Sequence, residues 1–240
     1  MRAHPTTFSA FILLATTLLT ASAVQAQATF SLGPCVGFTM STFHYSSSYF
    51  DYATDARSGY RPGYAAGLQA SLGVGHWVVQ PAVLYAQMGH RLNGVDSYWS
   101  PPQPISQEVR ANYLVIPLTV ARTQHPTGQG LQVFAGPYLG ILLGGHAQVE
   151  NRYGLTTGNV ANAHQDHNDG NFYSQRFDGG LQAGLGYRHQ QWLIRATYCL
   201  GLHSMDVSYD PSRGASPYYQ TYYYNRAFQL SLAYLVSCKQ

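Results

Sequence analysis

Two glycine-bracketed heptads, GLQASLG at residues 67–73 and GLQAGLG at residues 180–186, constrain the fold of this chain more than any other feature. Neither ends in the Gly-Lys-Ser/Thr of a phosphate-binding loop, and neither has the G-x-G-x-x-G of a dinucleotide-binding turn. With a period of two, leucine and alanine fall on one face of each heptad, while glycine, serine and glutamine fall on the other. Both heptads therefore predict β-strands with one bulky apolar face and one small or polar face.

The same alternation recurs in six further segments, which gives eight candidate strands. A tilted membrane strand needs about 9–11 residues, and the segments reach that length. Long polar connections alternate with short turns, as in outer-membrane barrels with long extracellular loops and short periplasmic turns. The strands are residues 30–41, 64–75, 76–89, 112–122, 131–145, 177–188, 191–202 and 228–237, the third assigned by position because both its faces are apolar. The long connections are residues 45–63, 91–107, 149–175 and 204–221.

A soluble eight-stranded barrel or sandwich is the alternative, but it would bury its large apolar residues and expose charged ones. Only 10% of the residues are charged, against about 25% in typical soluble domains. A lipid-facing exterior explains both the scarcity of charge and the bulky face of each strand. The sequence therefore predicts an all-β fold, an eight-stranded antiparallel transmembrane β-barrel whose closure satisfies every backbone group in the hydrocarbon.

The N-terminus has the features of a secretory signal, with Arg2, an apolar run from about residue 8 to residue 19, and Val24-Gln25-Ala26 before the cleavage site. We expect residues 1–26 to be a cleaved signal peptide and residues 27–240 to be the barrel domain, with both mature termini in the periplasm. The apolar run is shorter than the ~20 residues of a spanning helix. The arginines are scattered, so no nucleic-acid-binding surface is expected.

Six segments of the chain carry a family resemblance: GPCVGFTMS, QPAVLYAQMGHR, NYLVIPLTVAR, VFAGPYLGILLGG, DGGLQAGLGY and FQLSLAYLV. Together they resemble the porin-like outer-membrane β-barrel family typified by PorT, which is found mainly in Bacteroidetes. The resemblance covers nearly the whole mature chain and implies an eight-stranded barrel in the outer membrane of a Gram-negative cell, without an assigned activity. The C-terminus, SCKQ, lacks the terminal aromatic residue common in such barrels.

Charged residues on the small face are the first candidate sites. Arg195 is expected to point into the barrel, where an isolated charge is costly, so it should pair with an acid or with water. Asp178 and Glu108 are the candidate acids. A structural ion pair in the lumen is favoured over a gating role. Because eight strands enclose an interior just wide enough for side chains, a narrow channel for small solutes is only the alternative function.

Two further clusters could carry chemistry. The segment AHQDHNDG offers His164, Asp166, His167 and Asp169, but its spacing matches no closed zinc site or EF-hand, so a solvated loop is favoured over a weak metal site. No cofactor is expected. A lipid hydrolase could use residues 203–206, but His203 and Ser204 face opposite sides of a strand and no G-x-S-x-G turn exists. The chain is therefore predicted not to be an enzyme.

The cysteines and tyrosines complete the prediction. Cys35, Cys199 and Cys238 are odd in number and lack zinc spacing, so packing roles are favoured over a disulfide. Tyrosine-rich loops, with Tyr45, Tyr49, Tyr52, Tyr218 and Tyr219, suggest binding or adhesion outside the cell. The other expected partners are outer-membrane lipid, periplasmic chaperones and the barrel-assembly machinery. The expected aromatic girdle is Trp77, Trp192, Tyr198, Tyr222, Tyr223, Tyr224 and Tyr234.

Overall fold

The computed structural model describes residues 29–46, 57–96, 101, 103–162, 171–207 and 222–238. This part of the chain is built from strands and turns, and none of it forms a helix long and apolar enough to cross a bilayer. The strands are β1 (Thr29–Tyr45), β2 (Arg57–Gly59), β3 (Arg61–Val74), β4 (Trp77–Asp96), β5 (Gln103–Thr123), β6 (Gly130–Asn151), β7 (Gly154–Ala161), β8 (Phe172–Tyr173), β9 (Phe177–His189), β10 (Trp192–Gly201), β11 (Tyr223–Tyr234) and β12 (Val236–Cys238).

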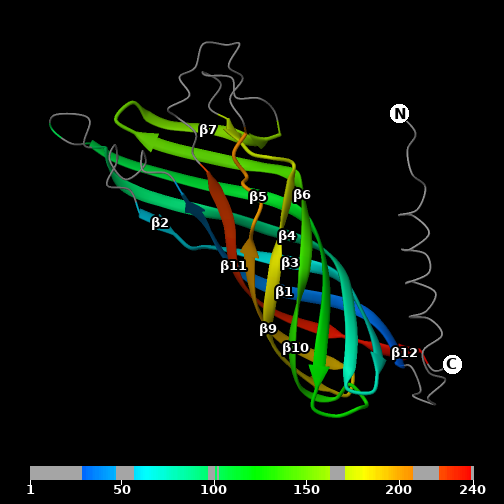
Figure 1. Cartoon of the computed structure of the whole chain (residues 1–240). Helices are drawn as coiled ribbons and strands as arrows, with labels where there is room; N and C mark the ends of the chain where they lie inside the picture. Colours follow the sequence, from blue (N-terminus) through cyan, green and yellow to red (C-terminus); the bar gives the residue numbers. More distant parts are fainter. Residues whose placement is uncertain are drawn as a thin grey trace, which may run out of the picture.

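Eight of the strands close into an antiparallel ring in the order β1, β3, β4, β5, β6, β9, β10 and β11 (Figure 1). The ring closes where β1 pairs with β11, from Cys35 opposite Ala233 to Tyr45 opposite Tyr223. Four short strands attach to it: β2 pairs with β4, β7 with β6, β8 with β7, and β12 with β1. The predicted eight-stranded barrel is confirmed.

Side chains alternate between the two faces of the wall as the heptads predict. In β9, Leu181 and Leu185 are exposed on the outside while Gln182 is buried inside. The third predicted strand follows the same rule despite its two apolar faces, because its inward residues join the interior packing. The exposed apolar band includes Leu32, Val36, Phe38, Leu68, Leu72, Val79, Val83, Ile116, Leu118, Val120, Val133, Leu139, Leu181, Leu185, Ile194, Phe228, Leu230 and Leu232.

The two ends of the barrel differ. At one end, called the turn end here, short turns join β3 to β4, β5 to β6, and β9 to β10, and β12 lies beside the start of β1 (Figure 1). Gly75 and Gln190 adopt positive φ angles of 57° and 54° in two of these turns. The opposite end carries the other connections and is called the loop end.

The wall on one side continues past the apolar band at the loop end. Strands β4, β5 and β6 have 20, 21 and 22 residues, about twice what a tilted strand needs to cross the hydrocarbon. Residues 91–96 and 103–107 belong to β4 and β5, so the predicted long loop 91–107 was wrong in extent. Residues 154–161 form β7 within the predicted loop 149–175. Both segments pair through the backbone beyond the apolar band, and each also buries an apolar side chain, Leu92 and Val160.

The heptad glycines are explained by close approach of the neighbouring strands. A Cβ on Gly67 would collide with the Val83 carbonyl oxygen, and a Cβ on Gly184 with the Ala196 carbonyl oxygen. At Gly180 the obstacles are the Leu200 carbonyl oxygen and the Tyr138 ring, whose Cε1 would lie at 2.8 Å. Glycine at these positions lets the strands coil tightly around a narrow interior.

We therefore expect Gly180→Ala to destabilise the barrel by about 1–3 kcal/mol, because the new methyl group overpacks the interior. The outward-facing neighbour is a matched control, since a Cβ on Gly179 would meet no atom within 4 Å. Heat-modifiable migration of the refolded variants in denaturing gels would measure the folded fraction. Equal folded yields for Gly180→Ala and Gly179→Ala would contradict the crowding argument.

Candidate functional site

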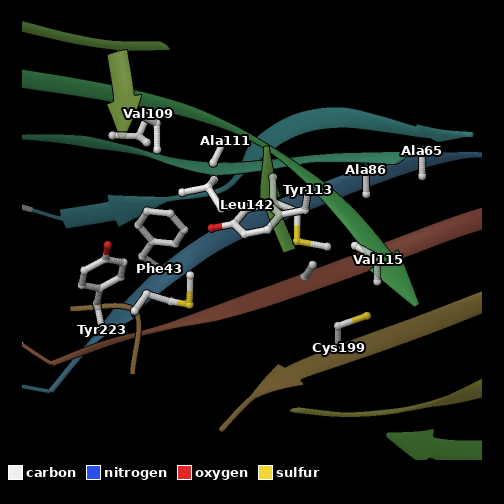
Figure 2. Packing of buried hydrophobic residues seen from close by; sticks show 14 of the residues in the cluster. Phe43, Ala65, Ala86, Val109, Ala111, Tyr113, Val115, Leu142, Cys199 and Tyr223 are labelled. Atoms are coloured by element: carbon white, nitrogen blue, oxygen red, sulfur yellow. The ribbon is translucent and has the colours of Figure 1, made fainter. Parts of the chain in front are cut away.

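The loop half of the interior is filled by an aromatic cluster, defined here as Phe43, Tyr45, His90, Phe172 and Tyr223. The ring centroids of Phe43 lie 4.5 Å from His90 and 5.0 Å from Tyr223, and the Tyr45 hydroxyl is 3.0 Å from His90 Nε2. The rings continue into a buried cluster that reaches down the lumen to Cys199 (Figure 2). Side chains thus occupy the interior at the loop end.

Asp178 lies below the aromatic cluster and is buried with a network of polar side chains. Its Oδ2 accepts hydrogen bonds from the Asn225 amide at 2.8 Å and from the Tyr138 hydroxyl at 3.2 Å. The hydroxyl of Tyr113 and the Oδ1 of Asp178 have no hydrogen-bond partner in the described protein. Buried oxygens of this kind are ordinarily satisfied by ordered water. Asp178 is therefore held by neutral donors.

Arg195 points into the turn half of the barrel from β10 and is 6% exposed. Its Nη2 donates to Thr119 Oγ1 at 3.2 Å, and its guanidinium carbon lies 3.7 Å from the centroid of the Phe134 ring. A desolvated contact of this type stabilises the cation by about 2 kcal/mol. Arg195 therefore rests on an aromatic face and a hydroxyl.

Neither acid considered from the sequence pairs with Arg195. The residue opposite Arg195 on β9 is Gly186, and Asp178 lies eight residues further along that strand, a separation of roughly 26 Å at 3.3 Å per residue. Glu108 is bonded to other arginines. The pairing depends on strand register and tilt, which a sequence pattern does not specify.

A second interior arginine was missed as a site residue. Arg188 is buried near the turn end, and its Nη2 donates to Ser31 Oγ at 3.0 Å. Its Nε donates to the Gln190 carbonyl oxygen at 3.3 Å. The signal was available, because Arg188 shares the inward phase of Asp178 and Gly184 in the alternation. Two cations thus lie in the turn half of the lumen.

Glu108 lies beyond the apolar band, on the loop-end extension of β5. Its carboxylate is 2.7 Å from Arg91 Nη2, 2.8 Å from Arg110 Nη2 and 3.1 Å from Arg61 Nε. Burial raises the pKa of Glu108, but hydrogen bonds from the three guanidinium groups outweigh burial and lower the pKa from 4.5 to about 2. Glu108 is therefore a carboxylate surrounded by three cations, and Arg195 is not one of them.

The residues predicted for the aromatic girdle lie on the outward phase of the strands in two groups, with one exception. Trp77, Trp192 and Tyr234 are exposed at the turn end, and the last two rings pack edge to face at 4.8 Å. Tyr222 is exposed at the loop end, while Tyr198 and Tyr224 are half-buried. Tyr223 was wrongly placed in the girdle: it is buried in the aromatic cluster because it shares the inward phase of Asn225 and Ala227.

The candidate metal ligands His164, Asp166, His167 and Asp169 lie outside the described residues, as do Tyr49, Tyr52, Tyr218 and Tyr219. Among the residues that are described, no group of three or more His, Cys, Asp or Glu side chains could hold a metal ion. The Ser204 hydroxyl accepts a hydrogen bond from the Asp206 backbone N–H at 3.3 Å, a local turn contact. The cysteines Cys35 and Cys199 are free and buried.

Replacing the ring at the centre of the aromatic cluster tests whether it closes the lumen. Phe43→Ala should cost about 3–5 kcal/mol and admit water to Cys199. In a Cys35→Ser, Cys238→Ser background, we expect a membrane-impermeant maleimide to label Cys199 only in the Phe43→Ala variant. Phe38→Ala, which removes a lipid-facing ring from the same strand, is the control. Labelling of Cys199 with Phe43 intact would show that the lumen is open.

The titration of Glu108 tests the arginine contacts. Because the pKa is lowered in the folded protein, the stabilising contribution of Glu108 is complete above about pH 4.5 and falls as the pH drops towards 2. Carboxyl-carbon NMR of the wild type should give a midpoint near 2, and we expect Arg110→Gln to move it towards 4.5. An ordinary midpoint in the wild type would rule out the contacts in solution.

Comparison with known proteins identifies the family. The model of the outer membrane protein beta-barrel domain matches residues 25–207. Among solved structures, the chain is similar to Ail, the attachment invasion locus protein of Yersinia pestis, solved in complex with the heparin analogue sucrose octasulfate. The two chains are 11% identical over 86% of this chain and 99% of that chain, and the TM-score is 0.41. It is also similar to OprG from Pseudomonas aeruginosa, at 11% identity over 87% and 95% of the two chains, with a TM-score of 0.32. No curated protein matches. The chain belongs to the outer membrane protein beta-barrel domain family, and its location is the outer membrane.

Proposed function

We propose that this protein is a closed, non-enzymatic outer-membrane barrel whose loop end faces outward and presents a projecting β-sheet for binding or adhesion. The observation that carries the proposal is the continuation of β4, β5 and β6 past the apolar band, above a lumen filled with side chains. In this orientation the turn end and both mature termini are periplasmic. Cleavage of residues 1–26 and a PorT-like, Bacteroidetes-type origin belong to the same proposal.

The filled lumen supports a scaffold over a channel. Phe43, His90 and Tyr223 pack together at the loop end, and Leu193 and Leu235 are fully buried at the turn end. Side chains from the facing strands reach across the interior between these layers, as in the contact of Arg195 with Phe134. An eight-stranded barrel has little interior space beyond its side chains.

The projecting sheet supplies an exposed surface suited to contacts. At its tip Tyr153 and Leu155 are 75% and 63% exposed, far from the lipid-facing band. The Arg152 guanidinium lies 4.8 Å from the Tyr153 ring centroid, so the tip combines an aromatic, an aliphatic and a cationic group. Tyrosine and arginine are the residue types that most often contribute strongly to protein interfaces. A contribution to binding from the tyrosine-rich segments, most of whose residues lie outside the described ones, belongs to the same proposal.

Planar-bilayer recording of the refolded mature protein tests the closed lumen. We expect no stable single-channel conductance from preparations that show heat-modifiable barrel migration. Phe43→Ala should raise conductance above the wild-type level, because it removes a ring from the loop-end plug. Reproducible channels in the wild type would replace the scaffold proposal with passage of small solutes.

The binding role is tested on cells that display the protein, measured for retention on mucin-coated and collagen-coated glass. The double variant Tyr153→Ala, Leu155→Ala should reduce retention, with Glu150→Gln in the adjacent strand end as the control at equal surface level. Retention of the wild type equal to that of cells without the barrel would remove the adhesive role.

A lipid-release assay comparing the wild type with Ser204→Ala tests the absence of hydrolase activity.

A further inference from the structure

One surface is used by none of these roles: the arginine cluster, defined here as Arg61, Arg91 and Arg110 around Glu108. Three guanidinium groups share one carboxylate, which leaves a formal charge of +2 within the cluster. The side chains of Arg91 and Arg110 are 54% and 53% exposed, whereas that of Arg61 is 6% exposed. Two of the three cations are therefore open to an external partner.

Arg91, Arg110 and Glu108 lie on the lipid-facing side of the wall, whereas Arg61 has the buried phase of Ala65 in β3. In β5, Arg110 and Glu108 share the outward phase of Leu114, Ile116 and Leu118. In β4, Arg91 shares the outward phase of Val83. On this face the apolar side chains give way first to Gln87 and Asn112, which are hydrogen-bonded to each other at 3.3 Å, and then to the arginines. The cluster therefore stands beyond the edge of the apolar band.

The height of the cluster matches the headgroup layer. Arg110 is four residues from Leu114, roughly 13 Å along the strand at 3.3 Å per residue, and about 10 Å along the membrane normal at the usual barrel tilt of roughly 40°. A headgroup layer occupies about 5–8 Å on each side of the hydrocarbon. Arginine side chains extend several ångströms towards such a layer while their stems stay on apolar surface.

The bonding leaves donors free for an anion. Each guanidinium has five N–H donors in a planar fork that matches a phosphate. Arg91 uses Nη2 on Glu108, and Arg110 uses Nε and Nη2. Glu108 thus fixes the orientation of both exposed groups and leaves the remaining donors directed elsewhere.

We propose that Arg91 and Arg110 bind the phosphate of a lipid headgroup in the leaflet at the loop end. Glu108 and Arg61 act as positioning residues that hold the two guanidinium groups. A lipid is favoured over a soluble anion because the cluster is in register with the lipid-facing columns and at headgroup height. This site is independent of whether the lumen conducts or the projecting sheet binds a partner.

The test uses the refolded full-length barrel in detergent micelles, with retained lipid counted by native mass spectrometry. The probes are diphosphoryl lipid A, its dephosphorylated form and inorganic phosphate. The variant is Arg91→Gln with Arg110→Gln, and the control is Arg122→Gln, an exposed arginine on the same face of β5 at the turn end. We expect the double variant to lose at least tenfold in affinity for the phosphorylated lipid, while the control keeps wild-type affinity.

Other outcomes overturn the proposal. Equal affinity of the wild type for the dephosphorylated lipid would show that phosphate is not recognised, and equal affinity for inorganic phosphate would indicate a soluble-anion site. A loss as large in Arg122→Gln would show general charge attraction. Should the double variant fail to fold, Arg110→Gln and Arg110→Lys are compared, and the lysine variant should retain more lipid because it keeps the charge.

Discussion

Closure of the ring between β1 and β11 is the constraint on which the rest of the structure depends. In hydrocarbon an unpaired strand edge leaves a row of unsatisfied backbone groups, each costing several kcal/mol, so the ladder from Cys35 opposite Ala233 to Tyr45 opposite Tyr223 cannot be omitted. Closing eight strands also sets the interior width. Gly67 and Gly184 follow from that width, because a methyl group at either position would meet the neighbouring strand.

The narrow interior also determines which groups can stabilise the buried charges of Asp178 and Arg195. Acid and base are kept apart, with Asp178 bonded to Tyr138 and Asn225 in the loop half, and Arg195 resting on Phe134 in the turn half. An ion pair would need both side chains in one layer, and the stagger of the strands places these two in different layers. Neutral hydroxyls, amides and an aromatic face supply the stabilisation that an opposite charge would give elsewhere.

The period of two was sufficient to predict the ring, its inward and outward faces and the short turns. It was insufficient where no lipid imposes a pattern. Residues 91–96 and 154–161 extend the sheet beyond the apolar band, where backbone pairing stabilises strands that lack a regular lipid-facing row of apolar residues. The partner of Arg195 could not be derived, because contacts across the lumen depend on stagger between strands. Tyr223 was misplaced because the cluster YYY was treated as one group, although consecutive strand residues face opposite sides.

The same alternation explains how a lipid-facing surface becomes a charged one without any change of fold. Along the outer face of β5 the side chains run from Leu118 through Leu114 to Arg110 and Glu108, and the strand keeps its register with β4 throughout. A side chain two positions nearer the loop end lies on the same face of the strand, further from the middle of the membrane. One strand can therefore carry, on its outward face, apolar side chains suited to hydrocarbon followed by cationic side chains suited to anionic headgroups. The boundary between them is set by the membrane, and the arginine cluster lies on its polar side.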